Sequence, residues 1–448
     1  MKKNRRTRLL ELEAEVLVDA LLALAKRDDA ADDLVERMIA TPKANIQRFK
    51  LKLASLKRSR RFVRWGESAG FARELEALLQ DLQAGVDDPP TGAELVVAFY
   101  ETDKGTLGNC DDSSGHIGDV YRFDAKELFV RYARACSDKE WLANLVFTLN
   151  REDDYGVRDT LIGCAAEYLP EPNIRILIGW FHTLTDKEKD KYTKRRWFHL
   201  IESLARQIGD AQLFETTRIA SWETLSTAAC VDIAKVYLES GDPRTALSWL
   251  EKISSDETYQ SHERDQLLGD IYGLLGETEK RADVAWRVFR RYRCQDSLDA
   301  LLSVIGDEQC AAITMGEVHS ILAGNVLSLS DAAFLVELGC LDEAETYLLD
   351  CADQLNGDFY GSLLPLAEAM EAAARHLAST IVYRALLDSI LRRGQTKTYP
   401  HGVRYLKILD RLAKSVSDWR SQDDHVTYLQ QLRQTHGKKY SFWSRYEK

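Results

Sequence analysis

The residues that could bind a metal ion are concentrated in one polar loop, residues 103–119. Within this loop, Asp111, Asp112, His116 and Asp119 offer carboxylate and imidazole donors to a divalent cation. No register of the loop has acidic or amide side chains at positions 1, 3 and 5, glycine at 6 and glutamate at 12, as a calcium-binding EF-hand requires. Helix capping explains the same residues, because Asp and Ser oxygens accept hydrogen bonds from free backbone N–H groups. We therefore expect capping in this loop.

Sequence signatures of catalysis are missing elsewhere. The nine histidines include no H-E-x-x-H motif and no pair four residues apart. His199 and Glu202 are one helical turn apart, but a di-iron bundle site needs a second such pair and two further carboxylates. The G-x-S-x-G, Walker A and G-x-G-x-x-G motifs do not occur. We expect no catalytic residue, no metal and no cofactor, and an enzyme whose site forms only in three dimensions stays an alternative.

The cysteines predict neither zinc nor disulfide chemistry. No C-x-C or C-x-x-C pair occurs, so a zinc finger or a dithiol redox motif is excluded. Scattered cysteines of this kind behave as small buried hydrophobes, which favours the cytoplasm. The eight are Cys110, Cys136, Cys164, Cys230, Cys294, Cys310, Cys340 and Cys351.

No membrane segment or leader is expected. No apolar run approaches the roughly 18 residues that a membrane span needs. The N-terminus is basic, but Glu11, Glu13 and Glu15 interrupt the apolar stretch that a signal peptide requires.

The charge of the chain is unevenly distributed. Residues 1–90 hold 18 Lys and Arg against 15 Asp and Glu, a balance of +3, although the whole chain carries −11. A basic segment of this kind raises the possibility of a nucleic-acid or other polyanion partner. If one helix continues through residues 43–64, it aligns Lys43 with the candidate contacts Lys50, Lys57, Arg61 and Arg64. Few aromatic residues lie nearby to stack on bases. The two that do, Phe62 and Trp65, fit core packing, so we expect only weak nucleic-acid binding without sequence preference.

Composition indicates that helices position all of these residues. The chain has 448 residues, is 45% hydrophobic and 29% charged, and contains only 8 prolines. Its dominant residue types favour helix almost throughout, and we find no convincing strand. Thr41 before Pro42 is typical of a helix start. An apolar helical pattern runs through residues 9–40, with Leu9, Leu12, Val16, Ala20 and Leu24.

A helical hairpin pattern recurs through the C-terminal half and resembles tetratricopeptide repeats. Small residues stand where two helices cross, an aromatic fills the gap between them, and glycine makes the turn. Gly241 to Gly276 is 35 residues, and Gly339 to Ala374 is 35 again. The units are Ala234, Tyr237, Gly241, Ala246, Leu250 and Ile253; Gly269, Tyr272, Gly276 and Ala282; Ala332, Leu335, Gly339, Ala344 and Leu348; and Ala367, Met370, Ala374 and Tyr383. We expect Tyr237, Trp249 and Tyr272 to be buried between hairpins.

Three stretches together resemble an uncharacterised bacterial family. They are RRFVRWGESAGFARELEALLQDL, the acidic loop with GHIGDV, and the ending YRALLDSILRRGQTKTYPHGVRYLKILDRLA with HGKKYSFW. The resemblance implies an all-helical module, which in some proteins follows a SWIM-type zinc finger. The chain lacks the C-x-C and C-x-H pairs of that finger.

These observations predict an all-α protein that forms an α-solenoid. We expect a basic helical region over 1–90, a helical middle region over 91–211, tetratricopeptide-like repeats over 212–395 and a C-terminal helical cap over 396–448. One hairpin cannot bury its own apolar face, so stacked copies leave a long exposed surface. In the cap, Phe442 and Trp443 are expected to dock.

The expected function is a cytoplasmic protein-interaction scaffold or adaptor without enzymatic activity. In the resembling repeats, the first helix of each hairpin lines the concave face. If this chain has the same arrangement, its concave face forms a groove that presents Asp232, Lys235, Glu239, Glu263, Gln266 and Asp270. Four carboxylates against one lysine favour a basic or amphipathic segment of a partner protein. A nucleic-acid-associated protein using the basic helix 43–64 is the alternative.

Overall fold

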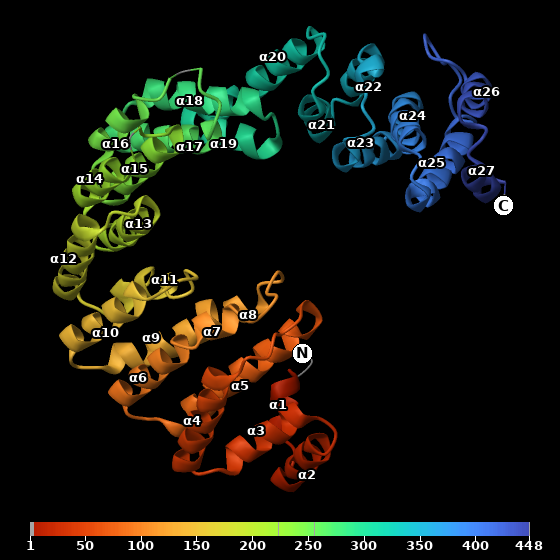
Figure 1. The fold of residues 1–448 in the computed structure, drawn as a ribbon. Coiled ribbons are helices and arrows are strands. Elements are labelled where there is room, and N and C mark those ends of the chain that lie inside the picture. Colours follow the sequence, from red (N-terminus) through yellow and green to blue (C-terminus); the bar gives the residue numbers. More distant parts are fainter. Residues whose placement is uncertain (1–3, 223, 255, 448) are drawn as a thin grey trace. The chain divides into compact units, whose positions relative to one another are not determined.

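The structure is a computed structural model that describes residues 4–222, 224–254 and 256–447. Figure 1 shows helices joined by loops along this whole length. The described residues form no strand, only an isolated parallel bridge between Val63 and Cys110. The predicted all-α class is therefore confirmed.

The chain divides into two compact units, Met1–Ser255 and Asp256–Lys448. A continuous apolar core runs from Phe49 to Leu204 in the first unit. A second core runs from Phe289 to Trp443 in the second unit. The division lies inside the region 212–395 expected to hold the repeats, and the finer division into four regions stays a prediction.

The helices of unit 1 are mostly short. The apolar pattern of residues 9–40 suggested long helices, but the structure has three short helices over residues 5–39. The helices are α1 Arg5–Leu10, α2 Ala14–Ala25, α3 Asp29–Ile39, α4 Pro42–Arg58, α5 Ser68–Gly85, α6 Pro89–Tyr100, α7 Asp103–Leu107, α8 His116–Asp119, α9 Lys126–Ala135, α10 Lys139–Arg151, α11 Asp159–Ile162, α12 Glu171–Lys187, α13 Lys191–Gln207, α14 Ala211–Ser221, α15 Thr227–Glu239 and α16 Pro243–Leu250.

The helices of unit 2 are α17 Ser261–Leu275, α18 Thr278–Arg291, α19 Gln295–Ile305, α20 Cys310–Leu322, α21 Leu329–Glu337, α22 Leu341–Asp350, α23 Tyr360–Ala372, α24 His376–Arg393, α25 Tyr399–Leu412, α26 His425–His436 and α27 Tyr440–Tyr446. Some of these helices pack against the next helix in the chain, as α17 does against α18 and α23 against α24, and others against the next but one, as α20 does against α22 and α25 against α27. As expected for the cap, Phe442 and Trp443 of α27 are buried.

Sequence signals account for many helix ends. Thr41 accepts a hydrogen bond from the Ala44 N–H, and Pro42 occupies the first turn of α4, as predicted. That helix ends at Arg58. The expectation of one continuous helix over 43–64 was therefore wrong, because Ser59 leaves the helical conformation and Val63 pairs with the backbone at residues 109–111 instead.

In the part of the chain that the structure describes, one turn structure occurs five times between consecutive helices. Its central residue has a left-handed backbone, with φ of +69° at Gly209, +86° at Gly241, +74° at Gly276, +75° at Gly339 and +58° at Ala374. In each turn the next residue donates its N–H to a carbonyl five residues earlier at 2.9 Å, as Asp242 does to Tyr237. In each turn the following helix begins two residues after the central residue. Three of these positions are predicted turn glycines.

The aromatic predictions hold in part. Trp249 is buried, and its indole N–H donates to Glu215 at 3.2 Å. Tyr237 is half-buried, and its hydroxyl also donates to Glu215. Tyr272 is half-buried as well. The expected full burial was wrong for both tyrosines, whose side chains remain partly accessible to solvent.

Candidate functional site

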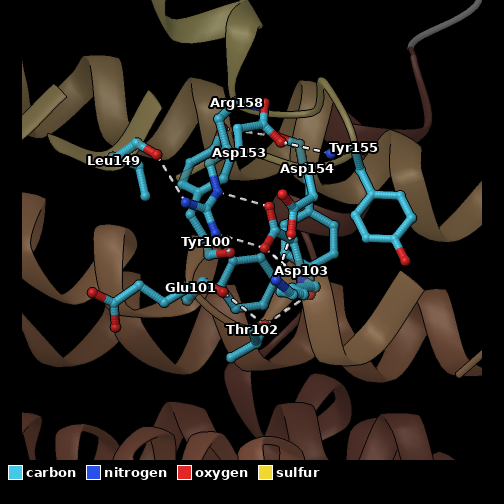
Figure 2. Close-up of polar contacts among 12 residues, drawn as sticks. Tyr100, Glu101, Thr102, Asp103, Leu149, Asp153, Asp154, Tyr155 and Arg158 are labelled. Atoms are coloured by element: carbon cyan, nitrogen blue, oxygen red, sulfur yellow. Dashed lines mark hydrogen bonds and ion pairs between the residues drawn. The ribbon is translucent and has the colours of Figure 1, made fainter. Parts of the chain in front are cut away.

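A buried ion pair joins the α6–α7 junction to the segment before α11 (Figure 2). The Arg158 guanidinium bonds both carboxylate oxygens of Asp103, each at 2.7 Å. It also donates to the carbonyl of Leu149 at 2.8 Å, and Figure 2 shows these groups converging around it. Burial disfavours the charge, but the hydrogen bonds that Arg158 donates to Asp103 outweigh this effect and raise the pKa of Arg158.

A second buried carboxylate, Asp153, organises the loop between α10 and α11. It accepts backbone N–H groups of Tyr155 and Gly156, both at 2.9 Å, and of Arg158 at 3.1 Å. Arg196 of α13 bridges Asp153 and Asp159, at 3.2 and 2.8 Å. Burial raises the pKa of Asp153.

This network has a structural role. All three nitrogens of the Arg158 side chain have protein acceptors, so Arg158 offers no free donor to a substrate. The network ties α6 and α7 to α10 and α13, which lie further along the chain. Sequence reasoning missed it, because no local pattern distinguishes Asp103 or Arg158 from a solvated charge.

The acidic loop works as a helix cap. The Asp112 carboxylate accepts the N–H groups of Ile117 and Gly118, at 2.9 and 2.8 Å, and so caps the start of α8. Asp111 bonds the backbone and hydroxyl of Ser113. These contacts confirm the capping interpretation. Among the described residues, no three His, Cys, Asp or Glu side chains are grouped so that they could hold a metal ion.

His199 and Glu202 lie beside a surface cavity of about 410 Å³. Glu202 is buried and accepts the Arg218 Nε at 2.8 Å. Burial raises the pKa of Glu202, although Arg218 opposes the shift. The other lining residues include Tyr192, Arg195 and Trp222, and the Arg195 guanidinium stacks 3.9 Å from the centre of the Trp222 ring. His199 and Glu202 are therefore part of a surface made mainly of arginine and aromatic side chains.

The predicted groove residues on α15 are engaged within unit 1. Asp232 pairs with Arg218 at 2.7 Å and with Arg206 at 3.5 Å. Arg206 also bonds Glu239, at 2.6 Å. Lys235 is half-buried on the same helix. These arginines compensate much of the negative charge expected for this face.

The predicted groove residues on α17 belong to unit 2. Gln266 and Asp270 are exposed, and Glu263 is half-buried. Behind them, the buried Asp265 pairs with Arg287 and Arg291 of α18, at 2.7 and 2.8 Å. Those arginines fix the hairpin and leave Asp270 without an ion-pair partner among the described residues.

The basic segment ends in a loop with exposed aromatic residues. Phe62 is 57% exposed and Trp65 is 63% exposed. The expectation that both fill the core was wrong. Only Val63 between them is buried, because its N–H donates to the Asn109 carbonyl and its carbonyl accepts from the Asp111 N–H, both at 2.9 Å. The side chain before Val63 in this extended stretch consequently faces away from the core.

The four candidate polyanion contacts do not share one helix. Lys50 and Lys57 are on α4, while Arg61 and Arg64 follow its end. Lys57 pairs with Glu101 at 3.0 Å and Arg61 with Glu67 at 2.7 Å, both at the surface. A cavity of about 380 Å³ opens beside this segment, with Lys52, Arg61 and Val63 among its lining residues.

Residues 4–445 match a family described as "Family of unknown function (DUF6880)". The chain belongs to this family. The match confirms the expected membership of an uncharacterised family and covers nearly every described helix, α1 included. No curated protein matches the chain.

For this DUF6880 member, association with a SWIM-type finger stays a prediction. Within the described part of the chain, no helix is both long enough and apolar enough to cross a bilayer.

Proposed function

We propose that this DUF6880 protein is a non-enzymatic scaffold of the cytoplasm, built as an α-solenoid of tetratricopeptide-like hairpins that bind a partner protein. The recurrent left-handed turn is the observation that supports this proposal. Five hairpins with the same turn and the same helix offset repeat one geometry along the sequence. Such repeats gain stability from neighbours and leave an extended surface for binding.

Burial at the crossing positions supports the same proposal. Ala234 and Ala246 of the first predicted unit are fully buried, as are Ala332 and Ala344 of a later one. Small buried residues allow two helices to approach closely. Their burial is what closely packed tetratricopeptide-like hairpins would require, and so it supports the proposal.

The exposed face of α17 is the partner site that we propose within unit 2. Asp270 and Gln266 lie on the first helix of the α17–α18 hairpin and are exposed, one helical turn apart. A basic or amphipathic helical segment complements this face. Asp232, Lys235 and Glu239 on α15 contribute polar hydrogen-bonding groups, since Arg206 and Arg218 already compensate the carboxylates.

Affinity purification of the full chain from its native host, with quantitative mass spectrometry, tests the proposal. The variant Gln266→Lys with Asp270→Lys reverses charge on the first helix without removing an internal ion pair among the described residues. We expect the recovery of specific partners to fall at least about tenfold, because the new lysines place like charges against a basic partner segment.

The matched control places the same lysines on the second helix of that hairpin, as Glu279→Lys with Asp283→Lys, both exposed. This control should keep the partners. Recovery of every partner by both variants, with unchanged helical circular dichroism, would contradict a binding site on α17.

A second candidate function is binding of single-stranded nucleic acid by residues 43–65. The exposure of Phe62 and Trp65 favours it, because solvent-facing rings among cations offer stacking platforms for bases. Arg58, Arg60 and Arg64 are exposed beside them. The surface pairs of Lys57 and Arg61 are weak enough to exchange for phosphate contacts.

Fluorescence anisotropy with a labelled oligothymidylate, over a salt series, measures this activity. Replacing Arg58, Arg60 and Arg64 by Gln should lower the log–log salt slope by about 2, since each phosphate contact contributes about 0.7. Phe62→Ala with Trp65→Ala should weaken binding with little change in that slope. The control removes three cations elsewhere, by Arg131→Gln, Lys187→Gln and Lys189→Gln. Equal losses in this control and the arginine variant would show nonspecific attraction only.

A further inference from the structure

Helix α2 is apolar on nearly every side, yet none of its residues is buried. Val16, Val18, Leu22 and Leu24 are 51%, 51%, 45% and 53% exposed. A helix that is hydrophobic all round is normally found inside a protein core or a membrane. With 12 residues it measures about 18 Å, too short to span a bilayer. Much of the apolar surface of α2 therefore lacks a covering partner.

Helix α3 covers one side of α2. On that side Leu17, Leu21 and Ala25 recur every fourth residue and are half-buried, and α2 packs against α3. The neighbouring helices extend the uncovered apolar surface. Its further members are Leu9, Leu10, Leu12, Leu34, Met38 and Ile39, which are 42–73% exposed. Exposed apolar side chains gathered on successive helices in this number are typical of an interaction site.

The charges at the two ends of α2 identify the occupant. Glu13 and Glu15 stand at its start, and Lys26 and Arg27 follow its end. All four are exposed, and none has an ion-pair partner among the described residues. A helix laid antiparallel on α2 would need basic groups against the start and acidic groups against the end. A second copy of α2 in that orientation has this arrangement.

We propose that α2 pairs antiparallel with α2 of a second copy of the chain, giving a two-fold dimer. The symmetry forms the same contact twice, with the acidic start of each helix against the basic end of the other. The apolar sides of the two helices bury each other between these contacts. The inference is independent of the scaffold function, because it concerns only α1–α3.

The arrangement of charge has a competing explanation that the test must separate. Acidic residues at a helix start and basic residues at its end also complement the dipole of their own helix. That effect stabilises α2 within one molecule and requires no partner. Only a dimer makes the charges of one copy matter to another copy.

Sedimentation velocity of the full chain at micromolar concentrations measures the assembly. Wild type should sediment as a species of twice the 50.9 kDa chain mass. Leu22→Glu should give a monomer, because it places charge in the apolar contact. Two further variants test orientation: an acidic one with Lys26→Glu and Arg27→Glu, and a basic one with Glu13→Lys and Glu15→Lys.

Each charge variant alone should dimerise at least about tenfold more weakly, since like charges then meet at both ends. Mixing the two should restore a dimer with one copy of each. Matched controls are Lys187→Glu with Lys189→Glu, and Glu279→Lys with Asp283→Lys, which should dimerise like wild type. A monomeric wild type would overturn the proposal, and so would a dimer that is insensitive to the four charges or fails to form on mixing.

Discussion

Asp103 and Arg158 are almost excluded from water, with side chains 1% and 5% exposed. Removing one member of such a pair leaves the other charge buried without compensation. We predict that Asp103→Asn lowers the free energy of unfolding by about 3–5 kcal/mol, measured by urea denaturation. The control Glu171→Gln at the exposed pair with Arg175 should cost less than about 1 kcal/mol. Equal effects at both sites would refute the assigned structural role.

Glu202 provides a pH-dependent test at the same scale. Burial raises its pKa in the folded state above the ordinary value of 4.5. As pH rises from 4.5 through that raised pKa, the unfolded chain releases the proton first, so Glu202 makes the folded state progressively less stable. Glu202→Gln removes this loss, while Asp232 still pairs with Arg218. Urea unfolding from pH 3 to 7 should show the variant gaining on wild type with rising pH, and a pH-independent difference would contradict the assignment.

Residue environments were harder to predict than residue types. Phe62 and Trp65 look like core residues by composition, but the bridge at Val63 commits only the residue between them to the interior. Arg158 and Asp103 look like surface charges until the fold brings them together across 55 positions. A one-dimensional pattern contains neither the bridge nor the pairing.

At the scale of elements, the recurrent turn allows an experiment in both directions. Gly241 and Ala374 occupy equivalent positions with left-handed backbones, and no atom lies within 4 Å of a side chain added at Gly241. Backbone strain alone should therefore decide the outcome. We predict that Gly241→Ala destabilises the protein by about 1 kcal/mol and that Ala374→Gly stabilises it by about 0.5 kcal/mol.

Thermal melting of both variants beside wild type checks this pair. The melting temperatures should move in opposite directions. A loss of stability in both would mean that Ala374 gains more from its side chain than it loses to backbone strain.

Helix ends were predictable where a turn residue enforces them. The turns at Gly241, Gly276 and Gly339 were visible in the sequence, as was the start of α4 at Thr41. The end of α4 at Arg58 was not, because neither glycine nor proline marks it and tertiary contacts of the next segment decide it. The same holds for the breaks that divide residues 5–39 into α1, α2 and α3.

At the scale of the whole molecule, each unit has a core of its own. We predict that fragments 1–255 and 256–448 each fold in isolation, because the apolar clusters of each unit close within it. Circular dichroism and urea titration of both fragments provide the check. Each should show helix and a cooperative transition, and an unfolded fragment would contradict the division.

The all-α class and family could be predicted from the sequence, because helix propensity and the three familiar stretches extend over most of the chain. A boundary between residues 255 and 256 could not, because hairpin turns continue on both sides of it.

The recurrent turns also bear on how this protein can be engineered. At Gly209, Gly241, Gly276 and Gly339 no neighbouring atom lies within 4 Å of a built side chain, so the connectors face open space. Exposed connectors of this kind tolerate inserted sequence, whereas the helices they join do not. An epitope tag or a fluorescent reporter can thus be inserted at any one of these four turns, so that each hairpin can be labelled separately.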